Sequence, residues 1–163
     1  MHFSFCALAV SALVIGSAAH AAGKVDVEMV NPQRFADSGG WNRGDANLET
    51  ISRYLRQLGT QYLPAGQSLK IEVLDVDLAG YVRPSRRGDV RLLIGGADWP
   101  RIQLRYTLQG DGQTLQSGEA WVSDLNYLRN GADLRSYDPL RHEKRMLELW
   151  FRQTFAPSSS ASS

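Results

Sequence analysis

Residues 101–123 hold the pattern that most constrains the fold of this chain. Apolar and polar residues alternate from Ile102 to Leu108, which indicates a strand with one buried and one solvent-facing side. Gly110-Asp111-Gly112 follows, and residues of these types tolerate the positive φ of a tight turn. A second run, Gln113 to Ser123, leads back along the first. The pattern predicts a β-hairpin.

The rest of the chain adds two amphipathic helices and further strands. Apolar residues recur at spacings of three and four in two segments, which predicts helices that each bury one face. The predicted elements are a strand from Val25 to Met29, a helix from Asp45 or Asn47 to about Leu63, strands over Gln67 to Val82 and Asp89 to Ile94, the hairpin, and a helix opened by Asp138-Pro139 that reaches about Phe155. Strands gathered between flanking helices predict an α+β fold. We expect a twisted, mostly antiparallel sheet of about five strands in the order β-α-β-β-β-β-α, with both helices on one face.

The two predicted helices carry apolar stripes that such a sheet would cover. The first stripe consists of Leu48, Ile51, Leu55, Leu58 and Tyr62, and the second of Leu140, Leu147, Trp150, Phe151 and Phe155. Because both stripes need a common surface, we expect the helices to lie side by side.

The first residues have the features of a secretory signal peptide. An apolar run extends from Phe3 to Ile15, and Ala19-His20-Ala21 fits the small-x-small cleavage pattern. We therefore expect a signal peptide over residues 1–21, a single α+β domain over 22–155 and a disordered Ser-, Ala- and Pro-rich tail over 156–163. The protein would then be periplasmic or secreted, with no stable membrane span after cleavage.

The composition argues against several kinds of site and function. The single cysteine, Cys6, lies in the predicted signal peptide, so the mature chain would have no disulfide and no thiolate. Eighteen Lys and Arg residues against seventeen Asp and Glu give a formal net charge of +1, which argues against a general nucleic-acid-binding protein. No cofactor fingerprint and no phosphate-binding Gly-rich loop occurs in the sequence, and we expect no cofactor.

Several segments together resemble a known family. They are LPAGQSLKIEVLDVDLAG (63–80), ADWPRIQLRYTL (97–108), VSDLNYL (122–128) and EKRMLELWF (143–151). In this order they resemble a family of exported proteobacterial single-domain proteins catalogued only as a domain of unknown function. The resemblance covers nearly the whole mature chain and implies no activity and no functional residue.

Asp75, Asp77 and Asp98 are the best candidates for a polar site. Strict alternation would place Asp75 and Asp77 on the buried face of their strand, where an unpaired carboxylate is costly. Either a bulge turns them outward, or arginines such as Arg101 and Arg105 neutralise them, or they line a site. We favour the arginine pairing. A hard-cation site or a paired-carboxylate hydrolase is the alternative.

Aromatic residues offer another reading. Tyr81, Trp99, Tyr106 and Trp121 could line a groove that binds a peptide or glycan, although such residues more often belong to a core and its edges. An unpaired edge strand over 89–94 could also accept a partner strand. His142 is the only histidine beyond the predicted signal peptide, and one histidine cannot form a histidine metal cluster.

These patterns favour a non-enzymatic binding or accessory module of the bacterial envelope. The speculative binding residues are Asp75, Asp77, Asp98, Trp99, Arg101 and Arg105. The partner of such a module would be a protein, peptide or glycan of the envelope. The alternative function is a carboxylate-dependent metal-binding protein or hydrolase that uses the three aspartates.

Export can be tested directly. We expect mature protein recovered from the periplasm to begin at Ala22, because cleavage follows Ala19-His20-Ala21. N-terminal sequencing checks this, and periplasmic material that still begins at Met1 would contradict it.

Overall fold

The computed structural model describes residues 23–40, 43–86, 88–129 and 137–156. The predicted signal peptide, residues 1–21, lies outside the described residues, as do residues 157–163 of the predicted tail. The elements are β1 (Lys24–Met29), a 3₁₀ turn (Pro32–Arg34), α1 (Gly44–Tyr62), β2 (Gln67–Asp77), β3 (Tyr81–Arg83), β4 (Val90–Leu92), β5 (Arg101–Gly110), β6 (Gln113–Ser123) and α2 (Arg141–Phe155). No helix in this part of the chain is long and apolar enough to cross a membrane.

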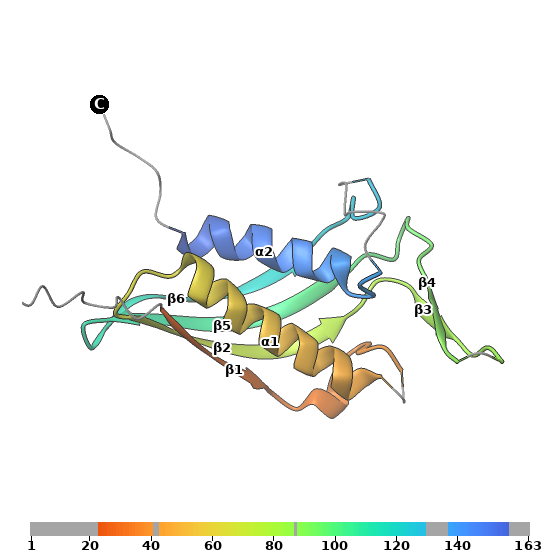
Figure 1. The fold of residues 1–163 in the computed structure, drawn as a ribbon, viewed down its shortest axis with the longest axis horizontal. Helices are drawn as coiled ribbons and strands as arrows, with labels where there is room; N and C mark the ends of the chain where they lie inside the picture. The colour runs from red at the N-terminus through yellow and green to blue at the C-terminus, as the bar shows by residue number, and fades with distance from the viewer. Residues whose placement is uncertain (1–22, 41–42, 87, 130–136, 157–163) are drawn as a thin grey trace, which may run out of the picture.

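A four-stranded sheet in the order β1-β2-β5-β6 forms the body of the fold, and both helices pack on the same face of it (Figure 1). β1 and β2 run parallel, because α1 carries the chain back between them, whereas the other two pairings are antiparallel. The α+β class and the arrangement of strands between two helices are confirmed.

β3 and β4 form a separate two-stranded antiparallel ribbon that projects from one end of the body (Figure 1). The predicted strand over 67–82 is therefore divided into β2 and β3, with a break at Leu78–Gly80. The strand predicted over 89–94 is shorter, since β4 spans Val90–Leu92, and it pairs along one edge with Tyr81–Arg83.

The predicted hairpin is confirmed as β5 and β6. Its two-residue turn consists of Asp111 and Gly112, with φ of 51° and 75°. Two successive positive φ values define the turn whose twist matches that of the flanking strands, and Asp-Gly is among its preferred sequences.

The core lies between the sheet and the two helices. Ile71, Val73, Ile102 and Leu104 are completely buried on the sheet. Most residues of both predicted stripes are buried as well, whereas Tyr62 and Trp150 of those stripes are partly buried. The fully or nearly fully buried helix residues are Leu48, Ile51, Leu55, Leu58, Leu147, Phe151 and Phe155. Gly59 allows α1 to approach β1 closely, since a Cβ atom there would lie 2.1 Å from Val25 Cγ2.

Two tyrosines of α1 join the helices to each other. The hydroxyls of Tyr54 and Tyr62 donate to the two carboxylate oxygens of Glu148 on α2, over 3.2 and 2.7 Å. Burial, followed by the nearby Glu148 charge, raises the pKa of Tyr54 above its ordinary value. Both hydroxyls therefore remain protonated donors at neutral pH.

The helices begin close to the predicted positions, but none of Asp45, Asn47 and Asp138 occupies an N-cap position. Arg43 occupies the N-cap position of α1, and the Asn47 side chain donates to the Ser38 carbonyl instead of capping the helix. α2 begins at Arg141, and the Asp138 carboxylate accepts the Leu140 N–H just ahead of it, over 2.9 Å. Neither N-cap residue makes a side-chain capping bond.

Phe151 tests whether α2 is docked as described. Its side chain is completely buried, with ring centroids 6.3 Å from Tyr62 and 5.0 Å from Phe155. Phe151→Ala should lower the free energy of unfolding by roughly 3–5 kcal/mol, because it leaves a large cavity. Urea denaturation measures this, with exposed Gln153→Ala as the control on the same helix. Equal stabilities of the two variants would contradict the packing.

Candidate functional site

Asp75 and Asp77 follow a bulge that turns them away from the core. The pairing of β2 with β5 shifts register between Val73 and Asp75, so Leu74 is the extra residue. The shift keeps Val76 completely buried and leaves both carboxylates partly exposed on the face opposite the helices.

The favoured arginine pairing is also present. Arg101 donates from Nε and Nη2 to the same oxygen of Asp77, over 2.7 and 2.6 Å. Arg105 instead pairs with Glu119 over 2.7 Å and lies 3.7 Å from Glu72. For Asp77, the bulge and the arginine pairing therefore occur together. Arg101 is its arginine partner, and Arg105 pairs elsewhere.

The other predicted site residues have separate structural roles. Asp75 accepts the Ala36 N–H over 2.9 Å, and Asp98 accepts the Gly80 N–H over 2.7 Å. Trp99 is partly buried just before β5. Asp75, Asp77 and Asp98 thus have separate partners, and within the described ranges no group of three or more His, Cys, Asp or Glu residues is placed to hold a metal ion.

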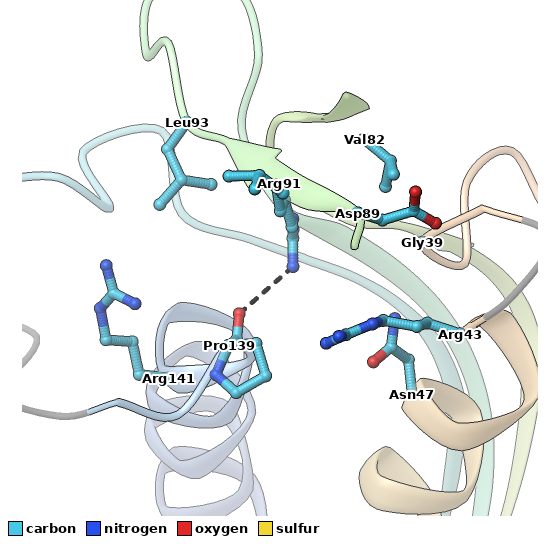
Figure 2. Close-up of a pocket in the computed structure, with 10 residues that line it drawn as sticks. Gly39, Arg43, Asn47, Val82, Asp89, Arg91, Leu93, Pro139 and Arg141 are labelled. Atoms are coloured by element: carbon cyan, nitrogen blue, oxygen red, sulfur yellow. Dashed lines mark hydrogen bonds between the residues drawn. The ribbon is translucent and has the colours of Figure 1, made fainter. Parts of the chain in front are cut away.

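A cavity of about 310 Å³ lies where the β3–β4 ribbon meets the beginnings of both helices (Figure 2). We call it the arginine cavity, since three guanidinium groups contribute to its wall. The lining residues are Gly39, Arg43, Asn47, Val82, Asp89, Val90, Arg91, Leu93, Pro139 and Arg141. The cavity thus draws residues from four separate segments of the sequence.

Arg91 is held in a buried ion pair with Glu143 of α2. Its Nη2 lies 2.7 Å from Glu143 Oε1, its Nε donates to the Ala79 carbonyl, and its Nη1 donates to the Pro139 carbonyl over 3.4 Å (Figure 2). The Glu143 side chain is only 1% exposed and also accepts the Ala79 N–H over 3.3 Å. Because buried charges are costly unless paired and hydrogen-bonded, this set of contacts fixes the ribbon to α2.

Arg43 and Arg141 differ from Arg91 in their contacts. Arg43 forms no ion pair with another described residue. Arg141 donates from Nη1 to the Asp138 carbonyl over 3.3 Å, and its buried Nε has no hydrogen-bond partner within the described ranges. Both residues stand at helix starts, where the backbone adds partial positive charge. These two guanidinium groups have donors to spare for an anion.

His142 lies apart from the cavity wall. Its buried ring packs edge-to-face on Tyr127, with centroids 5.0 Å apart. Burial, assisted by the Arg141 charge, lowers the pKa of His142 below its ordinary value, so the ring is neutral at neutral pH. Its place is in the core.

The residues that sequence reasoning missed are Arg43, Arg91, Arg141 and Glu143. Only Glu143 carried a usable signal, since it stands one turn before Leu147 and two before Phe151 on the buried stripe. A charged residue at such a position requires a partner. Nothing in the sequence pairs it with Arg91, fifty-two residues earlier.

The two ion pairs should differ in their contribution to stability. Glu143→Gln leaves the largely buried Arg91 without its counter-charge, and we expect a loss of roughly 3–5 kcal/mol in the free energy of unfolding. Asp77→Asn breaks a pair whose side chains are 23% and 47% exposed, and should cost less than about 1 kcal/mol because solvent screens it. Urea denaturation of both variants checks this, and an equal loss would contradict it.

Comparison with known proteins identifies the family of this chain. Residues 23–153 match a family described as Protein of unknown function (DUF3016). No curated protein and no solved structure matches the chain. Since the match runs from the residue before β1 into the last turn of α2, the chain belongs to this family of proteins of unknown function, DUF3016.

Proposed function

We propose that this chain is an exported, non-enzymatic binding module whose ligand is a small anion or an anionic group of a peptide, protein or glycan of the cell envelope. The observation that carries the proposal is the pair of guanidinium groups, Arg43 and Arg141, beside the arginine cavity. The predicted signal peptide and the family resemblance support the envelope as the location.

The volume and lining of the cavity limit the ligand. Pockets for small molecules usually measure about 300–1,000 Å³, so a cavity of about 310 Å³ suits a compact group rather than a large cofactor. Val82, Val90, Leu93 and Pro139 provide apolar wall, and the arginines provide charge. A carboxylate or phosphate attached to a small apolar body matches this combination.

Charge distribution favours the same ligand class. The segment from Tyr81 to Leu92 contains Arg83, Arg86, Arg87 and Arg91 against Asp89, a net charge of +3 from four minus one. The rest of the chain then has fourteen Lys and Arg against sixteen Asp and Glu, a net charge of −2. Positive charge is thus concentrated on the segment that forms one wall, where it would steer anions toward the cavity.

The side chains at the cavity suit binding better than catalysis. Arginine remains protonated throughout the physiological range, so it holds an anion but exchanges no proton with it. The carboxylate-dependent alternative has no comparable support, because the three aspartates have separate structural partners. Asp75 and Asp98 each accept a backbone N–H, and Asp77 pairs with Arg101.

Calorimetric titration of the mature protein tests this function. We expect benzoate to bind and its uncharged analogue benzamide to bind far more weakly, with inorganic phosphate as a second anionic probe. Arg43→Gln and Arg141→Gln should each weaken benzoate binding by about tenfold to a hundredfold, the effect of losing a charge-assisted hydrogen bond. Arg56→Gln, on the exposed side of α1, is the matched control and should bind like the wild type.

Three results would contradict the proposal. One is equal binding of benzoate and benzamide, and another is full affinity in the Arg43→Gln and Arg141→Gln variants. The third is absence of heat and of thermal stabilisation with both anionic probes at millimolar concentration.

A further inference from the structure

The two edges of the main sheet differ in length and charge. β1 has six residues, three of which are charged, namely Lys24, Asp26 and Glu28. β6 has eleven residues with a single charge, Glu119, and contains neither proline nor lysine. Proteins normally protect an open edge by shortening it or by placing charge and proline on it. β1 has such protection, and β6 largely lacks it.

Exposed apolar side chains accompany the β6 edge. Trp121 is 59% exposed and Leu115 is 54% exposed. Beside the strand, Leu149 of α2 is 40% exposed and lines a shallow groove with Trp121, Met146 and Trp150. Exposed apolar side chains gathered at an open strand edge and on the neighbouring helix are typical of an interface.

The geometry points to pairing of β6 with β6 of a second copy of this chain, antiparallel, across a two-fold axis at Gly118. Gly118 is the midpoint of Gln113–Ser123, and self-pairing about one point is the usual symmetry of a homodimer. The two sheets then join into one sheet of eight strands. This inference concerns the β6 edge and is independent of the arginine cavity.

Charge and side-chain order favour a second copy in this register. The axis at Gly118 sets Glu119 opposite Ser117 of the second copy, so the two carboxylates do not face each other. Each Glu119 is also neutralised within its own chain by Arg105, over 2.7 Å. A shift of the axis by one residue, to Glu119, would set Glu119 opposite Glu119, a like-charge pair that destabilises strands.

The apolar residues beside β6 also fit a two-fold axis at Gly118. β6 is regular from Gln116 to Ser123, since its register shift relative to β5 falls at the hairpin end beside Leu115. The axis brings Trp121 near Leu115 of the second copy. It also keeps the helices of both copies on one face, where α2 of each chain lies next to β6, so that Leu149 and the groove approach their counterparts.

A charge substitution at Ser117 tests both the partner and the register. We expect the mature wild-type protein to sediment as a dimer. Ser117→Glu sets a carboxylate opposite Glu119 of the other copy at both symmetry-related points and should raise the dimer dissociation constant by at least about tenfold. Ser117→Lys provides opposite charge at the same point and should leave the dimer intact or tighter.

Ser68→Glu is the matched control. It makes the same change at an exposed position of β2, an inner strand, and should leave the dimer unchanged. Sedimentation equilibrium gives the dissociation constants, and circular dichroism verifies that each variant is folded. A wild-type monomer at all concentrations, or a dimer equally tolerant of Ser117→Glu and Ser117→Lys, overturns the inference. A monomer that pairs β6 with an extended peptide of another protein overturns it as well.

Discussion

The side of β2 that faces the helices must remain apolar along its whole length, and one extra residue makes this possible. Ile71 and Val73 are completely buried, and the register shift at Leu74 returns Val76 to the same side. Without that shift, Asp75 and Asp77 would enter the core, where each carboxylate would lose its hydration. The bulge therefore protects the core and frees Asp77 to pair with Arg101 on the open face.

Beyond the end of β2 the chain leaves the sheet and forms the ribbon that builds the arginine cavity. Arg91 returns from this ribbon to Glu143 on α2 and to the Ala79 carbonyl. This buried set of contacts orients β4, and with it Val90 and Leu93, toward the starts of the helices. A structural ion pair thus fixes the shape of a cavity whose wall also includes Arg43 and Arg141.

The open face of the sheet contrasts with the β6 edge. Lys70 pairs with Glu28 over 3.2 Å, and Arg105 pairs with Glu119 over 2.7 Å, so cross-strand ion pairs cover the face opposite the helices. Such exposed pairs add little to stability, but they keep the face hydrated and unattractive to apolar surfaces. Exposed Trp121 and Leu115 lie on β6, the strand of the main sheet that has the fewest charges.

Local patterns in the sequence determined the elements of this fold. The alternation of Ile102 to Leu108, the Asp111-Gly112 turn and both helical stripes identify the hairpin, the helices and most of the core, because these depend on spacing along a single segment. The predicted aspartates did contact arginine or backbone, and the pairing of Asp77 with Arg101 could be foreseen from neighbouring strands.

Only the tertiary structure decided the parallel pairing of β1 with β2, the separation of the β3–β4 ribbon and the assembly of the arginine cavity. Arg43, Arg91 and Arg141 come from three separate segments, and each alone resembles an ordinary solvated arginine. Their common position results from the crossing of two helices and a ribbon, which no local pattern encodes. Contacts between distant segments depend on how whole elements pack, and packing is a property of the assembled core rather than of any stretch of sequence.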